Sequence, residues 1–319
     1  MTSFVRTQEI EHEIGPSGSF ALRVSSADVE LRGVEGSLAR VRVTFTIRAA
    51  TDADADAVLE SARFRLTASG SELEVSEPKR SESGLGALAG LLGMTKASVS
   101  PEVHVELPAS ARVRVEGVSA DVVATGLRGP QDFRTVSGDL VLEGGAGEIR
   151  LRGVSGDVSL RADGPLSDLE VNTVSGDVSA LAPRIEQLRI VTVSGDVEIE
   201  GELADGPGHR VETVSGDLTF GAVGDLTVEV RGLSSDVAIN VAHRSEGSRD
   251  RRRYVIGNGG ADLLFSSMSG DASIGAARRI GHARVTTTDG DQLQILQALE
   301  RGEIDVEEAA RRLAGEADA

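Results

Sequence analysis

The chain has 319 residues, with 33 lysines and arginines against 51 aspartates and glutamates, and a formal net charge of −18 at pH 7. This acidic balance argues against nucleic acid as the main partner, because phosphate binding needs local positive charge. The absence of cysteine excludes disulfides, zinc–thiolate sites and thiol nucleophiles. No stretch reaches the ~18–20 apolar residues of a transmembrane helix, and the acidic first residues show no secretion signal. The sequence therefore predicts a cytoplasmic protein, with association with the cell envelope as the alternative.

The first part of the chain carries strand patterns that are less regular than those that follow. Apolar and polar residues alternate in FALRVSSADVELRGVEGSLARVRVTF at 20–45, which contains an SSAD turn ending at Asp28. The segment TDADADAVLESA at 51–62 predicts a short helix, because aspartates near a helix start are favourable. FRLTASGSELEVSEPK at 64–79 predicts a hairpin. We expect residues 1–115 to form irregular first coils that cap the N-terminal end of a larger β structure.

The segment SGLGALAGLLGM at 83–94 is small, apolar and rich in glycine. It is too short to span a bilayer. It predicts a loop or a short helix packed on the flank of the β structure. The alternative is peripheral contact with a membrane surface, or binding of a partner.

A hexapeptide recurs along the region 116–288. Its copies are TVSGDL at 135–140, GVSGDV at 153–158, TVSGDV at 173–178 and 192–197, and TVSGDL at 213–218. Period-2 alternation before and after each copy is the signal of strands. A unit of this length cannot bury its apolar face alone, whereas a stack of such units can. The sequence therefore predicts an all-β, single-domain β-solenoid similar to a parallel β-helix, with coils of ~19 residues that rise by roughly 4.8 Å.

Each SGD copy predicts a sharp corner between two strands. Glycine permits positive φ, and serine and aspartate side chains can accept hydrogen bonds from turn amides. The corner residues are Ser137, Gly138, Ser155, Gly156, Ser175, Gly176, Ser194, Gly195, Ser215 and Gly216. Gly176→Val should therefore destabilise the fold by roughly a few kcal/mol.

The aspartate that ends each copy admits a second interpretation. Stacking places like carboxylates about 5 Å apart, where they repel by about 1 kcal/mol even in water. A bound cation would relieve that repulsion, so the alternative to a purely structural corner is a weak metal site. Its candidate ligands are Asp139, Asp157, Asp177, Asp196 and Asp217.

The repeat is interrupted once, between Asp236 and Asp271, which are 35 residues apart. We interpret this gap as one coil that carries an extra loop of about 15 residues. The sequence RSEGSRDRRR at 244–253 lies in the gap and is the one basic cluster on the acidic chain. It predicts a solvated loop, and the alternative is docking to an acidic partner, such as the flank of a neighbouring copy.

The repeats carry a resemblance to a known family. The stretch VHVELPASARVRVEGVSADV at 103–122, the TVSGDV and TVSGDL copies after it, and the weaker coil at 20–45 resemble the bacterial β-strand-repeat proteins labelled "putative adhesins", a domain family of unknown function. The resemblance covers about residues 15–285. It implies a β-solenoid, sometimes linked to envelope stress or surface contact, and no particular biochemical activity.

The chain changes character at residues 289–319. Helical spacing and a central Gly302 predict a short helical hairpin followed by a tail. The segment resembles a small helical module often attached to such β-repeat proteins. The hairpin either caps the last coil or docks a partner or a second copy, and its candidate docking residues are Leu293, Leu296, Leu299 and Leu313.

Catalytic constellations are not visible. The histidines do not recur in register with the repeat, and no nucleophile elbow, phosphate loop or metalloprotease motif is present. We therefore predict a non-enzymatic scaffold or interaction protein without a cofactor, which binds a protein partner or itself. The alternatives are a cation- or glycan-binding surface module, and a β-helix enzyme acting on polysaccharides through flank carboxylates such as Asp157 and Asp177.

Overall fold

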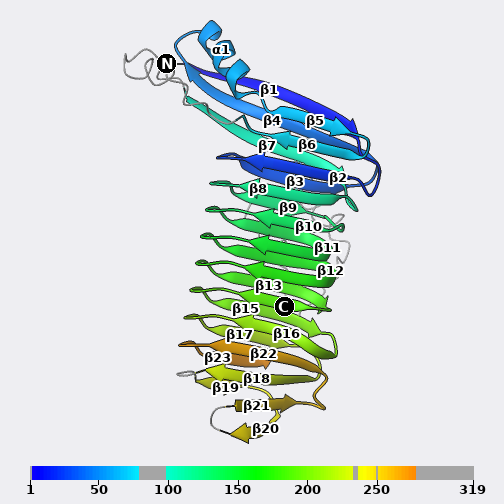
Figure 1. Ribbon diagram of the computed structural model, residues 1–319, viewed down its shortest axis with the longest axis vertical. Helices are drawn as coiled ribbons and strands as arrows, with labels where there is room; N and C mark the ends of the chain where they lie inside the picture. The colour runs from blue at the N-terminus through cyan, green and yellow to red at the C-terminus, as the bar shows by residue number, and fades with distance from the viewer. Residues whose placement is uncertain (1, 79–97, 233–235, 249–250, 278–319) are drawn as a thin grey trace, which may run out of the picture. The chain divides into compact units, whose positions relative to one another are not determined.

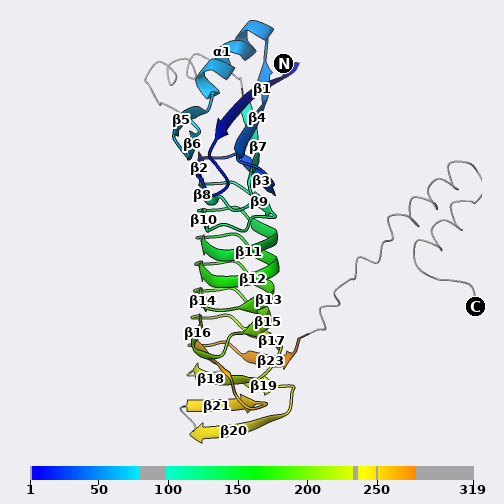
Figure 2. The same ribbon diagram turned by 90° about the vertical axis from the view of Figure 1, so that its right-hand side faces the viewer.

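Alternating apolar residues build a stack of coils, in which each turn of the chain pairs with the next through parallel strands (Figure 1). The computed structural model describes residues 2–78, 98–232, 236–248 and 251–277, and within them it contains 23 strands and one helix. Each regular coil has two short straight segments separated by two corners. The stack therefore has two faces, and Figure 2 shows β14 and β16 on one side and β13 and β15 on the other.

The first face consists of the strands that follow the SGD corners and of the strands that cover them at one end. In spatial order these are β1 (Thr2–Glu13), β4 (Leu38–Ala49), β7 (Ser98–Pro108), β3 (Asp28–Val34), β9 (Val122–Thr125), β11 (Leu140–Arg152), β12 (Val158–Asn172), β13 (Val178–Ile185), β15 (Val197–Leu203), β17 (Leu218–Ala222), β23 (Ala272–Ala276) and β19 (Val237–Ile239).

The second face consists of the strands that lead into the corners. In spatial order these are β5 (Arg65–Ser69), β6 (Glu72–Ser76), β2 (Ser19–Val24), β8 (Arg112–Gly117), β10 (Gln131–Arg134), the second halves of β11 and β12, β14 (Leu188–Val191), β16 (Gly206–Glu212), β22 (Ala261–Ser267), β18 (Leu226–Gly232), β21 (Arg251–Ile256) and β20 (His243–Ser248).

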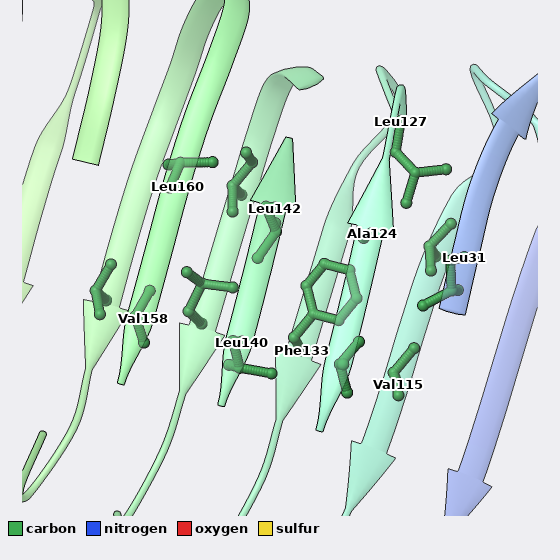
Figure 3. Close-up of a cluster of buried hydrophobic side chains, with 14 of the residues drawn as sticks. Leu31, Val115, Ala124, Leu127, Phe133, Leu140, Leu142, Val158 and Leu160 are labelled. Carbon is green, nitrogen blue, oxygen red and sulfur yellow. The ribbon is translucent and has the colours of Figure 1, made fainter. Parts of the chain in front are cut away.

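The core is a thin layer of side chains between the two faces. Figure 3 shows these side chains pointing into the space between strands, with like residues stacked from coil to coil. Leu140 lies opposite Val158, and Leu142 lies opposite Leu160, in adjacent coils. Phe133 pairs with Val115 and is fully buried. Each buried aliphatic or phenyl side chain contributes roughly 1.5–3 kcal/mol, so a few per coil hold neighbouring coils together.

The sequence predictions for the N-terminal part are confirmed in two places. Helix α1 (Asp52–Ala62) begins at a capping box, in which Thr51 and Asp54 exchange side-chain-to-backbone hydrogen bonds of 3.2 Å, and it buries Ala55 and Leu59. Strands β5 and β6 form the expected antiparallel hairpin. The coil of β2 and β3 is not the outermost one at this end, because β2 lies between β6 and β8, and β3 lies between β7 and β9.

The 35-residue gap does hold inserted residues, but they form strands, and the coils on either side of them are not stacked in sequence order. The coil formed by β22 and β23 does not follow the coil of β18 and β19 in space. It lies between that coil and the coil of β16 and β17, and Figure 1 shows it in orange inside the yellow-green end of the stack. Residues 244–253 are not one solvated loop either, because most of them belong to the antiparallel pair β20 and β21, which covers β18.

Two predicted segments, 83–94 and 289–319, lie outside the described residues. Among the described residues, no helix is both long enough and apolar enough to cross a membrane.

Candidate functional site

The SGD corner is shaped by its glycine. Gly176 has a φ of +116°, and a Cβ on it would lie 2.1 Å from the carbonyl oxygen of Gly156 in the adjacent coil. A side chain is therefore excluded twice, by the backbone conformation and by the neighbouring backbone. The same close approach recurs at Gly138, Gly156, Gly195, Gly216 and Gly270, with Cβ-to-carbonyl-oxygen distances of 2.1–2.3 Å.

The serines of the corners continue the strand pairing around the bend. The backbone N–H of Ser155 donates to the carbonyl oxygen of Val136 at 2.9 Å, and Ser175 donates to Val154 in the same way. Ser137, Ser194 and Ser215 repeat this bond at 2.8–2.9 Å. Coil-to-coil hydrogen bonding therefore does not stop at the corner.

The aspartates of successive corners are linked directly. The backbone N–H of Asp177 donates to Oδ1 of Asp157 at 2.9 Å, and the backbone N–H of Asp196 donates to Oδ1 of Asp177 at 2.9 Å. Within the described residues this chain of bonds, here called the aspartate ladder, connects Asp121, Asp139, Asp157, Asp177, Asp196, Asp217, Asp271 and Asp236 in that order. The first seven carboxylates in this order thus each satisfy one backbone donor of the next coil.

The ladder accounts for the repeated acid without a metal. One oxygen of each candidate cation ligand, Asp139, Asp157, Asp177, Asp196 and Asp217, accepts a backbone hydrogen bond, and the side chains are exposed to water. Across the described residues no three acidic or histidine side chains converge into a group that could hold a metal ion. What the ladder presents to solvent is a row of negative charge.

Beside the ladder lies a row of exposed apolar side chains that the sequence analysis did not single out. In the corners whose residues the structure describes, the residue three positions before the aspartate points outward, and Val154 and Val174 are each 47% exposed. This row, here called the corner ridge, comprises Val118, Val136, Val154, Val174, Val193, Val214 and Met268, which are 43–58% exposed. The signal for it was the period-2 pattern itself, since a buried threonine before each of Val136, Val174, Val193 and Val214 requires the valine to face out.

Where the residue before a ridge side chain is a threonine or a serine, it faces the interior of the corner and is buried, unlike the ridge itself. Thr135 and Thr173 are buried, and their hydroxyls donate to the carbonyl oxygens of Ser137 and Ser175 at 3.0 and 3.2 Å. Each threonine thus holds its own corner closed. Three other corners have a buried hydroxyl side chain at the same position, but these hydroxyls have no hydrogen-bond partner: Thr192, Thr213 and Ser267.

The four histidines that the structure describes do not form a shared site. Nδ1 of His104 lies 2.9 Å from Glu30, while Nε2 of His12 lies 2.8 Å from a loop carbonyl oxygen. His243 packs edge-on against Tyr254. His209 is buried on the second face. His282 and the leucines proposed for docking, Leu293, Leu296, Leu299 and Leu313, lie outside the described residues.

Two carboxyl groups on the second face have shifted pKa values. Burial raises the pKa of Asp168 despite the attraction of Arg150, and the nearby charges of Glu148 and Glu170 raise it further. Burial also acts to raise the pKa of Glu116, but its hydrogen bonds from two arginines outweigh that effect and lower it. Neither carboxyl lies on the corner ridge or in the aspartate ladder.

Comparisons with known proteins cover most of the chain. A family model described as Toastrack DUF4097 matches residues 21–275. The chain is also similar to three solved bacterial structures. A "putative cell adhesion protein" from Clostridium sporogenes is 12% identical, with 85% of this chain and 100% of that chain covered and a TM-score of 0.27. A "putative lipid binding protein" from Parabacteroides distasonis is 11% identical, with 85% and 97% covered and a TM-score of 0.35. A "putative adhesin" from Bacteroides fragilis is 11% identical, with 85% and 97% covered and a TM-score of 0.34. Among curated proteins no relative matches the chain.

Proposed function

The chain belongs to the Toastrack DUF4097 family, a domain family of unknown function, and we propose that in this member the β-solenoid is a non-enzymatic platform whose corner ridge binds a protein partner. The observation that carries the proposal is the ridge beside the aspartate ladder. Val174 and Asp177 lie three residues apart in one corner, and every regular coil repeats that arrangement.

An exposed apolar row of this length is unusual on a protein surface. Isolated exposed valines need no explanation, but contiguous apolar patches of a few hundred Å² mark interaction sites. The ridge has seven members, and with one rise of roughly 4.8 Å between neighbours it extends over about 29 Å. An α-helix of about 20 residues has the same length.

The charge beside the ridge selects the partner. The aspartate ladder is negative and exposed to solvent. A partner segment with apolar side chains flanked by basic residues would therefore pack its apolar side chains on the ridge and place its basic residues beside the ladder. A second copy that placed its own ridge here would bring two aspartate ladders together. Like-charge repulsion therefore disfavours self-association through this surface.

The geometry of the corners supports a binding role over an enzymatic one. The ridge lies on the outside of the corners, its neighbouring carboxylates recur from coil to coil, and one oxygen of each carboxylate is held by the backbone of the next coil. A general acid or base needs a position that differs from its neighbours, with a distinct pKa.

A designed peptide tests the proposal. The probe is a helical peptide of about 20 residues with leucines on one face and lysines beside them, and its control carries glutamates in place of the lysines. Fluorescence anisotropy should show that the lysine peptide binds the wild-type protein, that the glutamate peptide does not, and that salt weakens the complex.

Matched variants locate the surface. The triple variant Val154→Ser, Val174→Ser and Val193→Ser should lose about tenfold or more in affinity, whereas Val123→Ser with Val223→Ser, which are 39% and 43% exposed outside the ridge, should bind like wild type. Replacing Asp157, Asp177 and Asp196 with Asn keeps the hydrogen-bond acceptors and should weaken binding and reduce its salt dependence. Equal binding by the ridge and control variants would refute the proposal, and a dimer that dissociates on ridge substitution would show self-association instead.

A further inference from the structure

A cavity of about 400 Å³ lies on the outer surface of the second face, where the displaced strand β22 separates β16 from β18. Four arginines line it: Arg189, Arg210, Arg231 and Arg253. They come from four different strands, β14, β16, β18 and β21. This site, here called the arginine pocket, lies on a sheet face and not at the corner ridge.

Strand register explains why these side chains meet. Arg189 lies opposite Arg210 in the adjacent strand, and Arg210 lies opposite Leu264 of β22. Leu264 in turn lies opposite Glu229, and Glu229 lies opposite Arg253. The pocket therefore depends on the displaced coil, because a sequential stack would place β18 directly beside β16.

The charge at the pocket is the reverse of that on the whole chain. The lining contains four arginines and two carboxylates, Glu229 and Asp262, which leaves a formal charge of +2 with a neutral histidine, against −18 for the protein. A lining with excess positive charge suits an anionic group such as a phosphate monoester, which carries about −1.5 to −2 at neutral pH.

The guanidinium groups have free donors for such a ligand. Arg231 contacts Glu229 at 2.7 Å, and Arg253 lies 3.7 Å from Asp262. Arg210 is paired with Glu212, which does not line the pocket. Arg189 makes no ion pair with any of the described residues. Since each guanidinium has five N–H donors in a planar fork, a paired arginine can keep its carboxylate and still bind phosphate oxygens.

The pocket lining includes a buried histidine with an unsatisfied polar atom. His209 is 3% exposed, and its Nε2 lies 2.8 Å from the carbonyl oxygen of Ala204, to which it donates. Its Nδ1 is buried and has no hydrogen-bond partner. The preceding Gly208 lies at a register shift between β16 and β22, with a φ of +129° and open space where a side chain would be. Buried polar atoms are normally paired, and this unpaired Nδ1 is covered by protein atoms and not open to the pocket, so the arginines carry the binding argument.

We propose that the arginine pocket binds a phosphate monoester. The volume exceeds that of a bare phosphate and falls in the range of about 300–1,000 Å³ typical of small-molecule sites, so the ligand carries an organic group besides its phosphate. Bidentate contacts from guanidinium groups hold the phosphate oxygens. The phosphate monoester is either soluble or the headgroup of a lipid, and the proposal does not depend on the corner ridge.

Calorimetric titration of the full chain distinguishes these sources. The soluble probe is glucose 6-phosphate, with glucose and glucuronate as neutral and carboxylate controls, and the lipid probe is a phosphatidylcholine vesicle with or without phosphatidic acid. Binding of glucose 6-phosphate identifies a soluble ligand, and binding only of the phosphatidic acid vesicles identifies a lipid. Absence of binding to both, or glucuronate binding as tightly as glucose 6-phosphate, would overturn the proposal.

Three variants test the residues. Arg189→Gln should weaken binding by about 10- to 100-fold, the usual effect of losing one charged hydrogen-bond donor. Arg161→Gln on the first face is its matched control, because Arg161 is also exposed, forms no ion pair among the described residues, and removes the same charge. Asp262→Asn removes a repulsive charge and should strengthen binding severalfold, which a loss of structure cannot do. Equal affinities for the Arg189 and Arg161 variants would refute the assignment.

Discussion

The substitution Gly176→Ala, which adds one methyl group, measures how much the close contact between corner glycines constrains the stability of the fold. In Gly176→Ala the new Cβ adopts a backbone conformation with φ +116° and meets the carbonyl oxygen of Gly156 at 2.1 Å. A non-glycine residue at such a φ is destabilised by about 1–3 kcal/mol. Forcing an atom into a packed position adds about 1–3 kcal/mol, and here the obstacle is backbone that cannot rotate away. We expect a total loss of about 2–6 kcal/mol.

Substitutions at two other glycines separate the loss of stability caused by the backbone conformation from the loss caused by the steric contact. Gly224 has a φ of +91° and nothing within 4 Å of the position that a Cβ would take, so Gly224→Ala should lose only the conformational part, about 1–3 kcal/mol. Gly275 has neither constraint, and Gly275→Ala should be neutral or stabilising by about 0.5–1 kcal/mol. Urea unfolding followed by far-ultraviolet circular dichroism gives the three midpoints. If the Gly176 and Gly224 variants lose the same stability, the contact between corners contributes nothing to the stability of the fold.

Three further predictions concern the ladder, the core and the second face. Asp177→Ala should lower the unfolding free energy by about 0.5–1.5 kcal/mol, because the N–H of Asp196 loses its acceptor, while Asp177→Asn should lose less; equal losses in urea titrations would contradict this. Phe133→Ala should lose about 3–5 kcal/mol by the same assay, since the ring is fully buried, and a loss below about 1 kcal/mol would show that the coils collapse around the gap. Asp168→Asn should raise the melting temperature at pH 7, because a carboxyl whose pKa is raised by folding favours the unfolded chain once it is ionised. The gain should vanish well below pH 3.8, where the group is protonated in both states, and a gain independent of pH would rule out this cause.

The coils and corners could be predicted from the sequence because both are local. Alternation fixes which side chains face inward, and the glycine of each SGD copy marks the bend. The capping box at Thr51 is equally local, since its two hydrogen bonds join residues three apart. These features need no knowledge of what lies beside a given coil.

The neighbours of each coil could not be predicted in the same way. The carboxylate of Asp217 accepts a hydrogen bond from the backbone N–H of Asp271, not from that of Asp236, although all three aspartates end similar tetrapeptides. A repeat makes its copies interchangeable, so the pattern does not say which copy pairs with which. The arginine pocket was missed for this reason, since Arg189 and Arg253 meet only after the coil order is known. Nor could the repeated acid alone show that each carboxylate accepts a hydrogen bond from the backbone amide of the next corner.

The displaced coil has a consequence for the order of events during synthesis. Asp217 and Asp271 are 54 residues apart, whereas Asp196 and Asp217 are 21 apart, so closing the longer loop is less favourable by only roughly 1 kcal/mol. The larger effect is one of timing, because β18 and β19 leave the ribosome before β22 and β23 exist. During that interval the free edge of β16 and β17 faces a coil with the same inward pattern and a similar corner. We therefore expect the nascent chain to pair these coils first in sequence order and to separate them again before the last coil enters, which would slow the folding of this end of the solenoid.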